Sequence, residues 1–143
     1  MILLKTLMGQ LRLRDALFFG GAPVNRVQSV SIALVRGGYP RIPRGYLNFL
    51  GYSDGLVWNG IELFSCSVHE RAGTVFTQQD LLSYQEKYGL KKVFSKYLIL
   101  GRSTEILICY DSMGKSYVLL DRSSLQTILK FPRFEDLLYH LIY

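Results

Sequence analysis

The sequence predicts a single α+β domain with a largely antiparallel sheet and helices packed on it. Segments with strand character cluster in the second half of the chain instead of alternating strictly with helices, which is typical of this fold class. A length of 143 residues suits one domain, and no internal repeat or long linker divides it. Hydrophobic residues at 49% and charged residues at 20% indicate a globular chain. There is no run of about 18 apolar residues, so we expect no transmembrane helix.

Three helices are expected in the first third of the chain. Over about residues 2–14, apolar side chains recur at helical spacing, at Leu4, Leu7, Met8 and Leu11. The stretch 24–36 fits a helix by Val24, Val27, Val30 and Leu34, but it also fits a strand by the alternation around Val30, Ile32 and Leu34. The helix is favoured over the strand, and the glycine pair 37–38 that follows is typical of a helix C-terminus. A short third helix over about 43–51 begins at Pro43, because the first helical position needs no N–H.

A β-hairpin is predicted next. The apolar runs 56–58 and 61–64 are joined by Asn59-Gly60, and this dipeptide is the strongest short hairpin signal. A helix over about 77–88 is then expected, with Thr77 as its N-cap, an acid three residues on and Gly89 as its stop.

The remainder of the chain is predicted to form strands and one closing helix. Strands are expected over about 97–100, 106–110 and 116–120, with a further short strand over 127–130. Pro132 opens the last helix, which has an acidic first turn, where the helix dipole favours anions.

The positive charge is concentrated near the N-terminus. Residues 1–53 carry seven basic residues and one acid, Asp15, which accounts for the whole net charge of +6. A second basic cluster lies at Lys87, Lys91, Lys92, Lys96 and Arg102. A basic face steers anionic partners, which could be nucleic acid, a membrane surface or an acidic protein. Nucleic acid is not specifically favoured, because the sequence has no Lys/Arg-rich run, no helix-turn-helix spacing and no RNA-recognition aromatic motif.

The residue pattern offers no convincing catalytic or metal site. Cys66 and Cys109 form no CxxC pair, and with two histidines they argue against structural zinc. Both are expected in strands as buried, reduced thiols. Cys66 and His69 are the best nucleophile and base, but residues three apart on a strand point to opposite faces. We therefore predict no catalytic residue, no cofactor and no metal, and a hydrolase is only the third hypothesis.

The N-terminal segment does not indicate secretion. Its apolar run is interrupted by Lys5, Arg12 and Arg14, and no small-residue cleavage site follows. We therefore expect a cytoplasmic protein.

Several segments resemble the SUKH superfamily, and in particular its bacterial YrhA-like branch. Residues 41–50 resemble the family's Leu-Pro-x-x-Tyr-x-x-Phe-Leu helix, with Ile42 in place of the leucine before Pro43. Asp54-Gly55 stands at the family's Asn-Gly turn, ahead of the apolar strand and Gly60-Ile61-Glu62-Leu63. Segments 117–121 and 131–138 resemble its last strand and closing helix, and strands 97–101 and 109–111 fit as well. The resemblance covers about residues 24–142.

The resemblance implies a non-enzymatic binding role. Bacterial SUKH proteins are similar to immunity proteins of polymorphic and contact-dependent toxin systems, which bind a cognate toxin domain in the cytoplasm and block its active site or substrate path. Eukaryotic relatives are regulatory scaffolds, so a scaffold is one alternative. The other alternative, drawn from the charge pattern, is a nucleic-acid or anionic-surface binding module that uses the basic N-terminal half.

Seven residues are candidate partner contacts. Most lie around the turn-rich segment that follows the third helix, because loops carry recognition more often than core elements do. Trp58 fits either a core position or an aromatic anchor for a partner. Two lysines form a second electropositive spot. The seven are Arg41, Arg44, Tyr52, Asp54, Trp58, Lys91 and Lys92.

Overall fold

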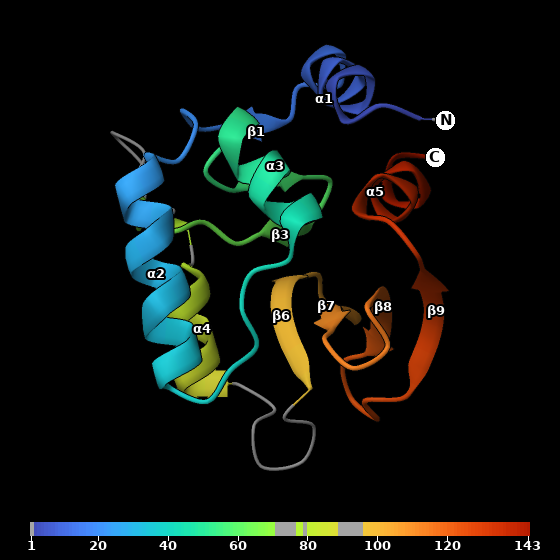
Figure 1. Ribbon diagram of the computed structural model, residues 1–143. Helices are drawn as coiled ribbons and strands as arrows, with labels where there is room; N and C mark the ends of the chain where they lie inside the picture. Colours follow the sequence, from blue (N-terminus) through green and yellow to red (C-terminus); the bar gives the residue numbers. More distant parts are fainter. Residues whose placement is uncertain (1, 71–76, 79, 89–95) are drawn as a thin grey trace.

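A seven-stranded sheet runs through the molecule in chain order (Figure 1). The computed structural model describes residues 2–70, 77–78, 80–88 and 96–143. Every pair of neighbouring strands in the sheet is antiparallel. The order is β1 (Leu17–Phe18), β2 (Leu56–Trp58), β3 (Ile61–Leu63), β6 (Tyr97–Arg102), β7 (Ile106–Asp111), β8 (Ser116–Asp121) and β9 (Thr127–Phe131). A separate two-stranded sheet pairs β4 (His69–Glu70) with β5 (Thr77–Gln78).

In the part of the chain that the structure describes, five helices pack against the large sheet or against one another, which confirms the predicted α+β domain. They are α1 (Leu4–Leu13), α2 (Val24–Arg36), α3 (Arg44–Tyr52), α4 (Leu81–Tyr88) and α5 (Phe134–Ile142). α5 packs on β8 and β9 and contacts both α1 and α3, while α4 packs on β6 and supports α2. Figure 1 shows α1, α3 and α5 grouped at one end and α2 running along one side of the molecule.

The turn between β2 and β3 has the predicted form. Asn59 and Gly60 have φ angles of 49° and 77°, and a two-residue type I′ turn requires positive φ at both central positions. Val57 and Glu62 pair across it. The predicted hairpin is therefore confirmed, with β3 ending at Leu63.

Residues 24–36 form the helix α2, which settles the ambiguity in the sequence. Gly38 follows with a φ of 86°, a conformation that glycine adopts without strain. The chain then turns back along α2, and the Tyr39 hydroxyl donates a hydrogen bond of 3.0 Å to the carbonyl oxygen of Gln85.

The helix predicted from Thr77 begins later, at Leu81, so that boundary is wrong. Thr77 lies in β5. Asp80 is the capping residue, because its Oδ1 accepts a hydrogen bond of 2.8 Å from the Ser83 N–H. The predicted stop at Gly89 lies outside the described residues. The strand β1 was not predicted at all.

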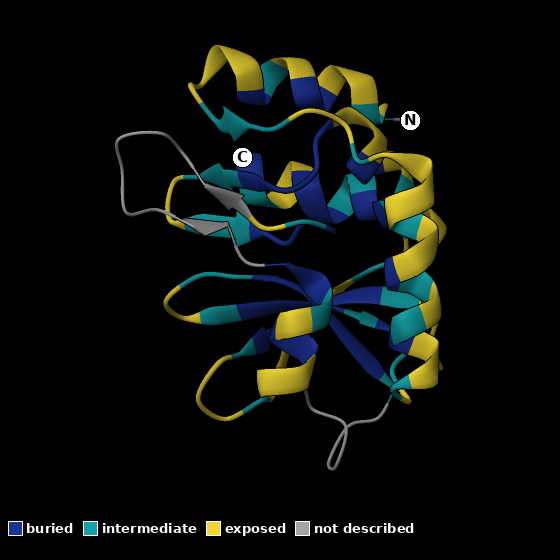
Figure 2. Cartoon of the chain, turned by 90° about the vertical axis from the view of Figure 1, so that its left-hand side faces the viewer, coloured by how far each residue is buried: buried dark blue, intermediate teal, exposed yellow. Residues whose placement is uncertain are grey.

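An aromatic cluster fixes α3 and α5 on the sheet. The rings of Tyr46, Phe49 and Phe134 lie 5.1–5.5 Å apart between centroids. The buried Tyr46 hydroxyl donates to the carbonyl oxygens of Phe64 and Leu100, at 2.5 and 3.2 Å. Figure 2 shows the strands dark blue in the interior and the helices yellow on their outer sides. α3 is thus a rigid support for the surface that it shares with α1 and α2.

Candidate protein-binding face

The cysteine chemistry considered from the sequence has no support in the structure. Cys66 lies in a bend after β3 and not in a strand, which corrects that prediction, whereas Cys109 lies in β7 as expected. Both are buried and free of disulfides. Burial raises the pKa of the Cys66 thiol to about 12, so the nucleophilic thiolate does not form near neutral pH. Within the described part of the chain, no group of three or more His, Cys, Asp or Glu side chains could hold a metal ion.

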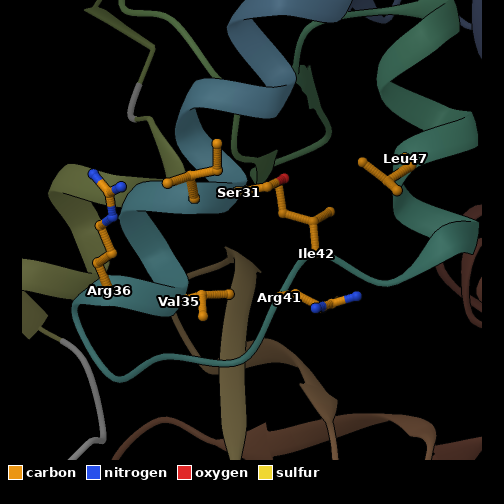
Figure 3. Close-up of a pocket in the computed structure, with 7 residues that line it drawn as sticks. Ser31, Val35, Arg36, Arg41, Ile42 and Leu47 are labelled. Carbon is orange, nitrogen blue, oxygen red and sulfur yellow. The ribbon is translucent and has the colours of Figure 1, made fainter.

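The most distinctive surface feature is an apolar groove between α2 and α3. Its volume is about 450 Å³. Figure 3 shows Val35 of α2 and Leu47 of α3 on opposite sides of the groove, with Ile42 between them. The lining residues are Ser31, Ile32, Val35, Arg36, Arg41, Ile42 and Leu47.

The groove exists because α2 carries more apolar residues than it buries. Its inward stripe uses Val30 and Leu34, which are buried. Ile32 and Val35 lie outside that stripe, and their side chains are 51% and 49% exposed. Ile42, in the returning segment, is buried beneath them. Exposed apolar patches with a polar rim mark interaction sites in soluble proteins.

Apolar exposure continues from the groove across the helical layer. Leu47 also lines a second hollow of about 530 Å³ between α1 and α3, together with Leu3, Lys5 and Tyr52. Leu3 lines a third, of about 350 Å³, between α1 and α5, with Tyr139 and Tyr143. We call this connected surface the helical face; it comprises Leu3, Ile32, Val35, Ile42, Leu47, Tyr52, Tyr139 and Tyr143.

The rim of the helical face is cationic. α1, α2 and α3 contain no acidic residue. Among the residues that the structure describes, ion pairs join Lys96 to Asp111, Arg102 to Glu62, and Arg133 to Glu135 and Asp136. None of these involves the three basic side chains that line the groove and the second hollow, which are Lys5, Arg36 and Arg41. The face therefore presents an apolar centre and a positive border.

Two of the predicted contact residues line these hollows, and a third, Arg44, lies in neither lining. Arg41 lines the groove, Arg44 is exposed at the first position of α3, and Tyr52 is exposed and lines the second hollow. Trp58 is half-buried in β2 and packs against the core. Lys91 and Lys92 lie outside the described residues.

Asp54 requires a correction, because it is not a surface residue. Its side chain is buried, and its Oδ1 accepts a hydrogen bond of 2.7 Å from the Cys66 N–H. Sequence reasoning also missed Ile32, Val35 and Leu47. The signal for Ile32 and Val35 was available in α2, where apolar residues outnumber the positions on one helical stripe.

No family model matches the sequence, and no curated protein matches it. In the ranges that the structure describes, no helix is long and apolar enough to cross a membrane.

Proposed function

We propose that this protein is a non-enzymatic immunity protein that binds a cognate bacterial toxin domain and neutralises it by occlusion. The observation that carries the proposal is the helical face, where an apolar groove is bordered by two arginines that form no ion pair with any described residue. The resemblance of residues 24–142 to SUKH proteins supplies the class of partner. The groove and its border supply a means of binding a protein surface.

The physical properties of the face suit protein binding. Interface energy concentrates in a few apolar, aromatic and arginine side chains that become desolvated in pockets. The helical face offers all three kinds, with Leu47 beside the groove, Tyr52 near it and Arg41 at its border. Because Tyr46 anchors α3 to the sheet, little conformational entropy is lost when a partner binds.

Nucleic-acid or anionic-surface binding is the second candidate, and the positive charge of residues 1–53 favours it. Affinity for nucleic acid comes mainly from cationic contacts to phosphate. Such contacts do not use an apolar groove, and the helical face is centred on one. Protein binding therefore accounts for more of this surface.

Co-expression tests the proposal directly. The C-terminal domain of a large toxin encoded in the reading frame immediately upstream would be induced in bacteria with and without this chain. We expect survival to rise by several orders of magnitude with the chain, and not to rise against a toxin domain from an unrelated locus. A folded, expressed chain that relieves no toxin of its own locus would refute the immunity role.

A further inference from the structure

We infer that the groove between α2 and α3 receives an acidic segment of the partner, with one apolar side chain inserted beside Val35 and Leu47. Carboxylates on that segment would then face Arg36 and Arg41. This inference rests on the proposed function, because it names the chemistry of the partner at the same face.

The dimensions of the groove suit an inserted side chain. At about 450 Å³ it lies within the range of about 300–1,000 Å³ typical of pockets that enclose small ligands. Its floor is fixed, because Ile42 is buried and Tyr39 is tied to α4 through the Gln85 carbonyl. A hollow with a fixed floor accepts a protruding anchor, whereas a flat bilayer surface would leave it unfilled.

The positive charge at the border of the groove favours a partner segment that carries carboxylates beside its apolar anchor. Arg36 and Arg41 are exposed on either side of the apolar lining, and neither has an ion-pair partner within the described chain. A planar guanidinium binds a carboxylate through two parallel hydrogen bonds. α1, α2 and α3 contain no acid, and no ion pair between described residues involves Arg36 or Arg41, so both guanidinium groups can bind carboxylates of a partner.

Two variants, each with a matched control, test the charged border and the apolar lining of the groove separately. Arg36→Glu/Arg41→Glu and the control Lys115→Glu/Lys130→Glu both lower the formal net charge from +6 to +2. The control residues are exposed, in the β7–β8 turn and on β9, and β9 and α2 lie on opposite sides of the molecule (Figure 1). Val35→Gln removes an exposed groove residue, and Val24→Gln changes an exposed valine of the same helix outside the groove.

The probes are three fluorescent 16-residue peptides that place a single Leu, Phe or Trp among glutamates, and the same peptides with lysine for glutamate. Fluorescence anisotropy would measure Kd at physiological salt. We expect at least one acidic peptide to bind, and at least tenfold weaker binding by Arg36→Glu/Arg41→Glu and by Val35→Gln. The two control variants should stay within about twofold of wild type. Amide NMR shifts on binding should cluster at residues 31–36 and 41–47.

Several outcomes would overturn the inference. These are no binding of any acidic peptide, equal binding of the lysine peptides, or equal losses in the two charge-reversed pairs. Tighter, arginine-dependent binding of a 20-base-pair DNA or of phosphatidylglycerol vesicles would also overturn it. In the co-expression assay, full protection by both wild type and Arg36→Glu/Arg41→Glu would refute the inference alone, whereas no protection by wild type would refute the immunity role.

Discussion

Asp54 shows how a single residue can look like a recognition group and yet serve the interior. Its side chain is 2% exposed. Its Oδ1 accepts from the Cys66 N–H at 2.7 Å, and its own N–H donates to the Gly20 carbonyl at 2.9 Å. It therefore ties the start of β2 to the bend after β3 and to the segment before α2. A buried backbone N–H needs such an acceptor.

Replacing Asp54 should affect stability and leave binding intact. In Asp54→Ala the buried Cys66 N–H loses its acceptor, which costs about 1–3 kcal/mol of unfolding free energy. An exposed residue two positions earlier gives the reverse pattern: Tyr52→Ser should change stability by less than about 0.5 kcal/mol but weaken partner binding. Urea unfolding would measure the stability of the folded variants, and protection in the co-expression assay would measure their binding of the toxin domain. If the Asp54→Ala protein has normal stability but has lost binding, Asp54 is a residue of the binding interface, and its assignment to the interior is wrong.

At the scale of elements, the junction of β3 and β6 depends on a glycine. Gly101 pairs with Leu63, and the register of β6 against β7 shifts between Ile99 and Gly101. A Cβ on Gly101 would collide with the backbone carbonyl oxygen of Glu62 and lie 2.9 Å from Leu63 Cδ2. Gly9, in contrast, is exposed in α1 with open space around its Cα.

The two glycine positions should respond in opposite directions to the same substitution. Gly101→Ala forces β3 away from β6, and overpacking of this kind costs about 1–3 kcal/mol. Gly9→Ala should stabilise the protein by up to about 1 kcal/mol, because alanine favours a helix interior. Urea unfolding at neutral pH compares them. Equal stability of the two variants would contradict the close approach at Gly101.

Secondary-structure elements that a local sequence pattern specifies were predictable. Elements that depend on pairing with a strand distant in the sequence were not. Asn59-Gly60 fixes its hairpin by local backbone geometry. β1 has only two residues, and its pairing partner Leu56–Val57 lies about 40 positions away, so no local pattern marks it. Thr77 resembles a helix cap, but pairing with the strand at 69–70 takes it into β5.

The same division applies to the candidate site. Arg41, Arg44 and Tyr52 were identified because they lie near turns. The groove itself escaped prediction, since Val35 and Leu47 come from separate helices that only tertiary packing brings together. The exposed apolar residues of α2 also explain why residues 24–36 resembled a strand: they fill positions that an amphipathic helix usually leaves polar.

For the whole molecule, the part of the chain that carries the net positive charge is also the part that forms the first three helices. Residues 1–53 hold the entire net charge, and they form α1, α2, α3 and β1. The remaining residues carry equal numbers of acids and bases and supply the rest of the sheet. The excess positive charge therefore lies on the helices that supply most of the helical face, an arrangement that speeds encounter with an acidic partner, by an effect that weakens with added salt.

Global stability should fall at alkaline pH because two thiols are buried. Burial raises the pKa of Cys66 from 9.0 to about 12 and raises that of Cys109 further. The unfolded chain loses these protons near pH 9, while the folded chain keeps them. Their contribution is therefore fully present below pH 9 and is lost as the pH rises towards 12. Each thiol should remove about 1.4 kcal/mol of stability by pH 10.

Urea unfolding at pH 7, 8, 9 and 10 measures this loss. The buried tyrosines Tyr46 and Tyr117 also have raised pKa values, but they titrate in the unfolded chain near pH 10, so the cysteines dominate the change between pH 8 and 9.5. The double variant Cys66→Ala/Cys109→Ala starts from lower stability, because truncation leaves space in the core. Its unfolding free energy should nevertheless decline much less steeply over that interval. Parallel declines in the variant and the wild type would show that the thiols are not protected in the folded state, and would contradict the burial of both side chains.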